Sequence, residues 1–344
     1  MSSRERRSCH AIRRVCRVDL DWVVIDEAQR VPDLLNEIHS LYEQRGLNFA
    51  ITGSSARKLK RSDANLLAGR AIRCDFFPLV WQEIQDETLL LRCIDFGTLP
   101  YVVTHPEFGA DTLYSYIETY LKEEVAAEAL TRNLEPFARF LRTAAQHHAQ
   151  VLNVENISRE CAVKRRTVDN YFGIIEDTLL GRRLPAIQFG RVTKEVAHPK
   201  FYFFDAGVAR AASGWIREDM PDAWRGFSLE TIVLNELRAR GSFMKKEKEI
   251  YHYGVNGGWD VDFIVETKPK IMHEPATYAA IEVKLSKTWK KEWSAPLIEL
   301  ARDKKARVNV CFGVYLGSDI LEDGPLTIMG LTEFSRRLWA GELF

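Results

Sequence analysis

The strongest constraint on the fold lies near the start of the chain, where two short apolar runs flank an amphipathic stretch. Residues 18–28 (VDLDWVVIDEA) read as a buried strand that ends in two acids, and residues 47–55 (LNFAITGSS) as a second strand that ends at a Gly-Ser turn. Between them, residues 31–46 carry apolar side chains at helical spacing and close on a glycine. This order of strand, helix and strand predicts a parallel sheet. A further short strand is predicted at residues 71–80, stopped near Pro78.

The rest of the chain changes character twice. A helical pattern covers about residues 82–150, and residues 151–187 look like two short helices joined by a turn. Later segments alternate between strand and helix patterns: strands at 198–205, 250–255, 259–266, 279–285 and 308–317, with an amphipathic helix over 226–240.

Polar residues stand at the ends of the first two strands. Asp26 and Glu27 end the first strand, and Thr52 and Ser54 follow the second. One carboxylate at such a position can hold Mg²⁺ as a hard oxygen ligand, and the next can orient an attacking water, as in P-loop ATPases. A small polar residue on the second strand can sense a γ-phosphate. The alternative is that the two acids only cap a strand.

The phosphate-binding loop that should accompany these acids is missing. No GxxxxGK[ST] motif occurs in the 344 residues, and only 22 residues precede Val23, too few for a strand, a loop and a helix. Backbone N–H groups and the lysine of that loop normally cradle the triphosphate. We therefore expect poor ATP affinity and no ATP hydrolysis by this chain alone.

Four blocks occur in an order that resembles one family: VVIDEAQRVPDLLNEI, FAITGSSARKL, LLAGRAI and FPLVWQEI. They look like the bacterial and archaeal AAA-type ATPases that carry a C-terminal domain of uncharacterised function. The resemblance implies that Asp26 and Glu27 belong to the Walker B strand, that Ser54 belongs to the sensor strand, and that Arg70 is a recurrent family arginine without an assigned role. The absent Walker A half indicates a truncated or degenerate member.

A helix-turn-helix pattern occupies the middle of the chain, with its turn near Ala162 and Val163. Basic residues open the second helix and can meet phosphates, while an asparagine further along can reach a base edge. The candidate nucleic-acid residues are Lys164, Arg165, Arg166 and Asn170. The resembling family carries a winged-helix-like element here. Such modules also mediate protein contacts or only connect domains.

An acid–acid–lysine set marks the C-terminal part. Asp262 lies in one predicted strand, Glu282 and Lys284 lie two residues apart on the same face of another, and Glu230 lies on the preceding helix. Alternation also places Asp260 on the face of Asp262. Two carboxylates about 4 Å apart repel by roughly 4 kcal/mol at an effective dielectric near 20, so a metal ion or the lysine must offset them.

This pattern resembles the PD-(D/E)XK nuclease superfamily. The resemblance implies Asp262, Glu282 and Lys284 as catalytic residues and Glu230, Asp262 and Glu282 as ligands of Mg²⁺. In such a site the carboxylates hold the metal ion, and the lysine positions or deprotonates water and stabilises developing charge. An ExK pair alone is common on strands, and domains with this core can lack cleavage activity.

The expected architecture is α/β, in three parts. Residues 1–81 form a partial AAA-type P-loop sheet, residues 82–195 a helical and winged-helix-like region, and residues 196–344 a restriction-endonuclease-like domain. Three hypotheses stay open for its function. The chain is an Mg²⁺-dependent nuclease, a non-catalytic DNA-binding or regulatory protein, or an ATPase that needs a missing N-terminal segment.

Charge and cysteine content limit the partners and the compartment. Lys+Arg and Asp+Glu both number 48, which excludes a polybasic coating protein but leaves room for a local basic patch. Six scattered cysteines without a CxxC pair indicate free thiols in a reducing cytoplasm. No apolar run approaches the roughly 18 residues of a membrane span. The partners we expect are nucleic acid, and either another copy of the chain or a protein that supplies the missing P-loop.

Overall fold

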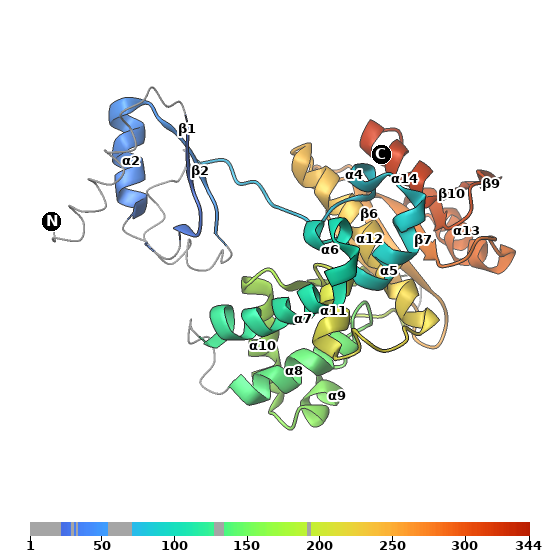
Figure 1. Cartoon of the computed structure of the whole chain (residues 1–344). Coiled ribbons are helices and arrows are strands. Elements are labelled where there is room, and N and C mark those ends of the chain that lie inside the picture. Colours follow the sequence, from blue (N-terminus) through green and yellow to red (C-terminus); the bar gives the residue numbers. More distant parts are fainter. Residues whose placement is uncertain (1–21, 29–30, 32–33, 54–70, 127–133, 191–193) are drawn as a thin grey trace, which may run out of the picture. The chain divides into compact units, whose positions relative to one another are not determined.

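The structure is a computed structural model, and it describes residues 22–28, 31, 34–53, 71–126, 134–190 and 194–344 (Figure 1). The chain forms two compact units. One consists of residues 1–73 and 174–180, and the other of residues 74–173 and 181–344. Together they make a mixed α/β protein. Among the described residues, no helix is both long enough and apolar enough to cross a lipid bilayer.

The first unit confirms the predicted strand–helix–strand order. Strand β1 (Trp22–Ile25) pairs in parallel with β2 (Asn48–Ile51), and helix α2 (Leu34–Arg45) connects them. The helix buries three apolar residues at spacings of three, which gives it one packed face: Leu35, Ile38 and Leu41.

The strand predicted at residues 71–80 is wrong. The segment is irregular, and Ile72 and Phe76 are 83% and 94% exposed, so the apolar residues of its first part are not buried as a strand face. Pro78 lacks the N–H that a sheet ladder needs. Two of the proposed nucleotide residues, Ser54 and Arg70, lie outside the described residues.

The described helices that follow the first two strands comprise short helices and one long helix of 22 residues. In chain order they are α4 (Trp81–Ile84), α5 (Leu90–Phe96), α6 (Pro100–Thr104), α7 (Gly109–Thr119), α8 (Leu134–Gln146), α9 (Val154–Glu160), α10 (Arg165–Asp177), α11 (Ala206–Ser213), α12 (Asp222–Phe243), α13 (Ser294–Arg302) and α14 (Leu331–Ala340). Short 3-10 turns occur at Glu87–Leu89, Pro106–Phe108 and Lys291–Trp293, and a π-helical turn at Tyr120–Ala126.

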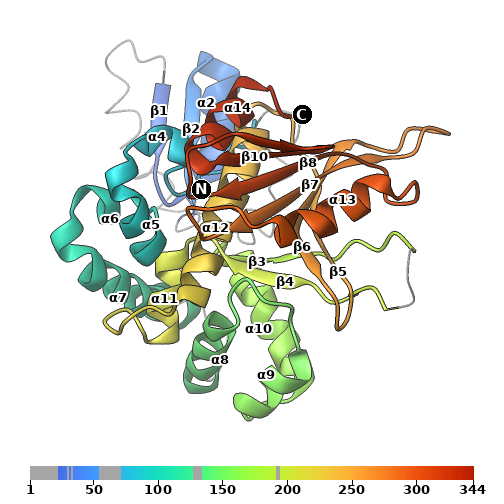
Figure 2. The ribbon, with the colours of Figure 1, turned by 90° about the vertical axis from the view of Figure 1, so that its right-hand side faces the viewer.

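A six-stranded mixed sheet forms the body of this unit, in the order β5-β6-β7-β8-β10-β9 (Figure 2). Its strands are β5 (Ile250–Gly254), β6 (Asp260–Lys268), β7 (Thr277–Lys284), β8 (Val308–Tyr315), β9 (Leu321–Asp323) and β10 (Leu326–Gly330). The first three are antiparallel neighbours, and β8 then returns parallel to β7 through α13, as a crossover connection requires. We predicted neither β9 nor β10 from the sequence.

Helices cover both faces of this sheet. In β7, Ala279, Ile281 and Val283 join the apolar cluster that contains residues of α12 and α14. Ala280, between them, joins the cluster that contains residues of α13. This alternation buries the strand on both sides, which explains its nearly continuous apolar sequence.

A small two-stranded sheet joins β3 (Gly181–Leu184) to β4 (Lys200–Phe203) in antiparallel register. Strand β4 is buried along its whole length and precedes a sharp turn into α11. Asp205 caps that helix, since its Oδ1 accepts a hydrogen bond of 2.9 Å from the Val208 N–H. The sequence pattern predicts that Asp205 and Gly207 shape a turn; Asp205 lies at the turn, whereas Gly207 lies inside α11.

One interpretation of the helical region needs correction. The pattern places both His147 and His148 on the surface, but His148 is fully buried. Its Nδ1 accepts the Phe203 N–H at 3.1 Å, and its Nε2 lies 2.8 Å from the Thr231 hydroxyl. These partners from β4 and α12 satisfy both ring nitrogens, and burial lowers the pKa of His148 to about 3.

Candidate functional site

The acid–acid–lysine set lies on two neighbouring strands. The register of β6 and β7 pairs Phe263 with Ile281, so the next position places Asp262 opposite Glu282. Asp262 and Glu282 are only 4% and 6% exposed. The Oδ2 atom of Asp262 accepts a hydrogen bond of 2.8 Å from the Val283 N–H, which fixes this carboxylate against the neighbouring strand.

Lys284 lies two residues beyond Glu282, and its ammonium group pairs with Oε1 of that residue. The other oxygen, Oε2 of Glu282, is buried and has no hydrogen-bond partner among the residues that the structure describes. A buried carboxylate oxygen without a partner is costly unless a proton or a cation satisfies it. Glu282 therefore presents one open coordination position inside the site.

A second lysine, which sequence reasoning missed, lies among the remaining carboxylates. Lys200 of β4 has a side chain only 7% exposed, and its Nζ lies 3.7 Å from Oε2 of Glu230, 3.7 Å from Oδ2 of Asp260 and 3.5 Å from Oδ1 of Asp262. The prediction that Asp260 and Asp262 share a face agrees with their common contact. Tyr202, also on β4, donates its hydroxyl to Oε2 of Glu230 at 2.9 Å.

The charges do not balance when all groups are ionised. Four carboxylates face two ammonium groups: Glu230, Asp260, Asp262 and Glu282 against Lys200 and Lys284. Burial, with the charge of Asp262, raises the pKa of Glu230 to about 8 and that of Glu282 well above its ordinary value. The excess negative charge thus attracts either protons or a further cation.

The pKa values of the two lysines are raised as well, which favours their charged form. Burial opposes the charge on Lys200, but Glu230, Asp262 and Asp260 outweigh it and raise the pKa of the ammonium group. Burial likewise opposes the charge on Lys284, whose pKa Glu282 and Asp262 raise. Both lysines are therefore cations at neutral pH.

The residues fit a divalent cation in donor type and charge, but they are not arranged around one. Carboxylate oxygens are the ligands that Mg²⁺ prefers, and the open Oε2 of Glu282 lies next to Asp262. Among the described residues, no three His, Cys, Asp or Glu side chains converge closely enough to hold a metal ion. Lys200 already neutralises the carboxylates of Glu230 and Asp262, which accounts for this arrangement.

The first unit brings together part of the predicted nucleotide residues. Asp26 and Glu27 follow β1, and Thr52 follows β2. The Thr52 hydroxyl donates to Oδ1 of Asp26, and the Glu27 N–H lies 3.3 Å from the Thr52 oxygen. The polar ends of the two parallel strands therefore contact each other, as the sequence pattern indicates.

The helix-turn-helix elements occupy the predicted positions. Helix α9 is capped by Asn153, Ala162 adopts a left-handed conformation in the turn, and Arg165 opens α10. The proposed nucleic-acid residues Lys164, Arg165, Arg166 and Asn170 are all exposed. Arg165 pairs with Glu155 of α9, so this arginine is held within the motif.

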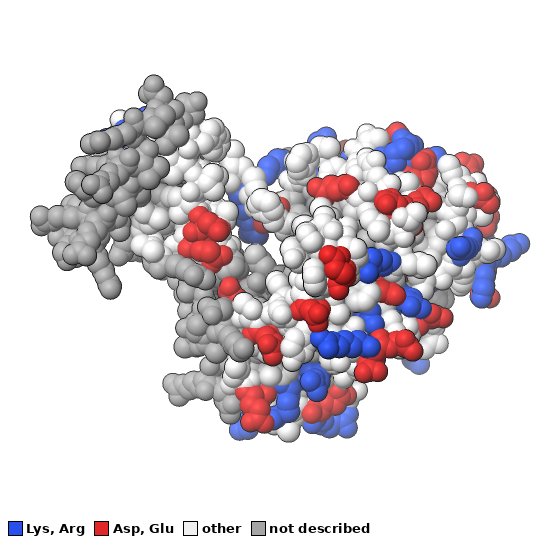
Figure 3. Space-filling view, in the orientation of Figure 1, with Lys and Arg blue, Asp and Glu red and all other residues white. Residues whose placement is uncertain are grey.

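The apolar side of this motif packs inward. Val168 is buried, and the ring of Tyr171 lies 5.1 Å from that of Phe137 and 5.2 Å from that of Phe140 on α8. The exposed charges of the molecule are mixed: on the face shown in Figure 3, blue Lys and Arg side chains alternate with red Asp and Glu. That face carries no large area of one sign.

Three family matches divide the chain. The AAA domain family matches residues 4–85, a domain of unknown function (DUF8612) matches residues 87–219, and another (DUF4143) matches residues 225–334. These matches support an AAA-like ATPase-family protein. The carboxylate cluster takes Asp262 and Glu282 from the third region and Lys200 from the second.

Curated relatives occur in bacteria and archaea, and each is named only as uncharacterized. One from Mycobacterium tuberculosis is 26% identical over 225 residues, covering 61% of this chain and 50% of the relative. One from Haemophilus influenzae is 23% identical over 273 residues, covering 73% and 64%, respectively. One from Methanocaldococcus jannaschii is 24% identical over 265 residues, covering 70% and 57%. The chain thus spans about half the length of the mycobacterial relative.

Proposed function

We propose that the second unit contains a divalent-metal site that cleaves phosphodiester bonds in nucleic acid. The observation that carries the proposal is the buried, partnerless Oε2 of Glu282 beside Asp262 and Lys284. The order α12–β5–β6–β7–α13–β8, with β7 parallel to β8, supports the resemblance to the PD-(D/E)XK superfamily. The carboxylate and lysine set lies on the middle strands of that order.

The chain's own residues have distinct roles in this proposal. Asp262 and Glu282 would hold Mg²⁺, which when bound neutralises phosphate charge and lowers the pKa of a coordinated water. Lys284, held as a cation beside Glu282, stabilises negative charge that develops on the phosphate. Lys200 holds Glu230 and Asp262 in place and limits the net charge of the site.

The test is nicking of supercoiled plasmid DNA by the full chain in Mg²⁺ and in Mn²⁺. We expect metal-dependent nicking that is lost in Asp262→Asn, Glu282→Gln and Lys284→Met. The matched control is Glu322→Gln, which removes an exposed carboxylate from edge strand β9 of the same sheet. Cleavage that persists in Glu282→Gln would reject the assignment. DNA binding without turnover would favour a non-catalytic binding protein.

The exposed start of α10 is the candidate DNA-contacting surface of this activity. Lys164, Arg166 and Asn170 are exposed, whereas Arg165 is engaged with Glu155. Each phosphate contact adds about one unit to the slope of the logarithm of DNA affinity against the logarithm of salt concentration. Replacing Lys164 and Arg166 together by Ala should weaken DNA binding uniformly across sequences and lower that slope by about two. An unchanged slope would remove this surface from the proposal.

A second proposal concerns the first unit. The AAA domain match and the contact between Asp26 and Thr52 support a nucleotide-binding half that is completed by a segment outside this chain or by a partner, including another copy. Binding of a fluorescent ATP analogue should be weak for this chain. It should strengthen in a version extended by the sequence upstream of Met1 in the genome, if that sequence supplies GxxxxGK[ST]. Hydrolysis that survives Glu27→Gln in the extended protein would contradict the role of these acids.

A further inference from the structure

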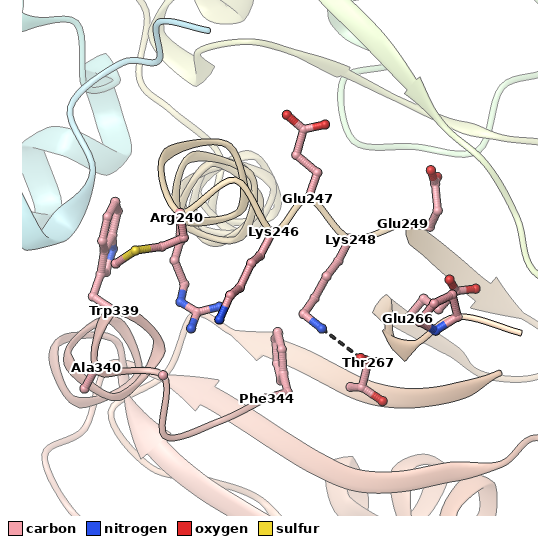
Figure 4. Close-up of a pocket in the computed structure, with 13 residues that line it drawn as sticks. Arg240, Lys246, Glu247, Lys248, Glu249, Glu266, Thr267, Trp339, Ala340 and Phe344 are labelled. Carbon is pink, nitrogen blue, oxygen red and sulfur yellow. Dashed lines mark hydrogen bonds between the residues drawn. The ribbon is translucent and has the colours of Figure 1, made fainter. Parts of the chain in front are cut away.

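A pocket of ≈ 880 Å³ lies in the second unit, away from the residues of the carboxylate cluster (Figure 4). The end of α12, the segment that leads into β5, the end of β6 and the C-terminal part of the chain line it. Its volume is within the range of small-molecule sites, about 300–1,000 Å³. Both aromatic and charged side chains contribute to its walls.

Arg240 is the most informative residue of this pocket. It is only 8% exposed, and its Nε atom is buried with no hydrogen-bond partner in the described ranges of the chain. Within the described part of the chain, no carboxylate lies at ion-pair distance from its guanidinium group. A buried guanidinium nitrogen without an acceptor is costly, because it has lost water without gaining a partner. The group therefore lacks a counter-ion that a ligand can supply.

Two lysines add to the positive charge. Figure 4 shows Arg240 and Lys246 directed into the same region beside Phe344. Lys248 lies across the pocket, with its Nζ 2.9 Å from the Thr267 carbonyl oxygen and 5.6 Å from the centre of the Phe344 ring. Burial, Arg240 and Lys246 all lower the pKa of Lys248, while Glu266 opposes them. Three cations thus repel one another here.

Three acids line the pocket: Glu266 acts on Lys248, whereas the other two are turned away from the basic groups. Glu247 and Glu249 come from the same segment as Lys246 and Lys248, but Figure 4 shows their carboxylates turned away from the three basic groups. Strand-like alternation of side chains along this segment explains the separation of the signs. The basic groups face the cavity with Phe344 and Trp339 beside them.

We propose that this pocket binds a small phosphorylated ligand, whose phosphate group pairs with Arg240, Lys246 and Lys248. A guanidinium fork matches two phosphate oxygens, and the ammonium groups supply further charge-assisted hydrogen bonds. The aromatic side chains at the pocket provide an apolar surface for the remainder of the ligand, and a mononucleotide has a planar ring that suits it. This site is independent of the metal site proposed above.

The test is calorimetric titration of the full chain with three probes: inorganic phosphate, AMP and adenosine. We expect phosphate and AMP to bind and adenosine to bind much more weakly. Tighter binding of AMP than of phosphate identifies the nucleotide class, and equal binding identifies recognition of phosphate alone. Binding of adenosine as tightly as AMP, or no binding of either phosphate compound, overturns the proposal.

Matched variants locate the binding in the pocket. Lys246→Gln should weaken phosphate or AMP binding about tenfold, the effect of losing one charged hydrogen bond. The control is Lys245→Gln, because Lys245 is the exposed neighbour that does not line the pocket. Arg240→Lys, which keeps the charge and loses the fork, should also weaken binding in protein whose circular dichroism is unchanged. Equal weakening by Lys246→Gln and Lys245→Gln would refute the assignment.

Discussion

Replacing Lys200 by methionine is the most informative perturbation of the carboxylate cluster. Methionine keeps the apolar stem but removes the ammonium group that lies 3.5 Å from Asp262 and 3.7 Å from Glu230. Removing one partner of a buried ion pair destabilises a protein by about 3–5 kcal/mol, because the other charge stays buried and unpaired. The contact with Asp260 adds little, since that side chain is 64% exposed and screened by water.

The loss of stability should depend on pH in a defined direction. Burial and Asp262 already raise the pKa of Glu230 to about 8 in the folded protein, above the ordinary 4.5 of the unfolded chain. A carboxyl group with a raised folded pKa takes up protons on folding, so stability is recovered as the pH falls from about 8 towards 4.5. Removing Lys200 raises this pKa further, so the two proteins differ in the charge of Glu230 only above about pH 8. We therefore expect a larger loss in Lys200→Met near pH 9 than near pH 5.

The assay is urea denaturation of the wild type and of Lys200→Met at both pH values. The control is Lys268→Met, which removes an exposed lysine from the strand that carries Asp262. Mn²⁺ should restore more stability to Lys200→Met than to the wild type, because a divalent ion can replace the missing ammonium group. Equal stability of Lys200→Met and the wild type near pH 9, or the same loss at both pH values, would refute this reasoning.

Three further predictions concern single buried groups. Glu230→Gln should flatten the dependence of stability on pH between about 5 and 8, since the raised pKa of Glu230 makes the folded state lose stability as the pH rises; titration monitored by thermal melting checks this. His148→Gln should reduce the loss of stability below about pH 6.5, because burial lowers the pKa of His148 to about 3 and the unfolded chain takes up the proton first; acid denaturation curves that match the wild type would contradict it. Asp205→Ala should destabilise the second unit by about 2 kcal/mol, since it removes a helix cap and the acceptor of the Thr98 N–H; urea midpoints measure it, with exposed Asp222→Ala as the control.

Short-range patterns predicted most strands of the fold. The alternation in β6 and the apolar run in β7 reflect burial between two helical layers, and burial is visible in the sequence itself. The segment at residues 71–80 was predicted wrongly by the same reasoning, because it is irregular and its apolar residues Ile72 and Phe76 are exposed. The surface position predicted for His148 was wrong because its hydrogen-bond partners, Phe203 and Thr231, lie far along the chain.

The candidate site could be predicted only in part, for the same reason. Glu282 and Lys284 are two residues apart, so strand periodicity alone brings them together. Lys200 is separated from Asp262 by 62 residues, and a lysine in the apolar segment KFYF carries no local signature of a charged cluster. The sequence offers one indication of the cluster: Lys200 is a charged residue at the start of an apolar strand, and a buried lysine requires a buried partner.

The cation site on the strands of Asp262 and Glu282 is tested most directly by the stoichiometry of Mn²⁺ bound to the full chain, measured by electron paramagnetic resonance. We predict one bound ion that is lost in Asp262→Asn and in Glu282→Gln and retained in Glu322→Gln. No bound Mn²⁺ in the wild type, or binding that survives both site variants, would contradict the claim that these strands carry a cation site.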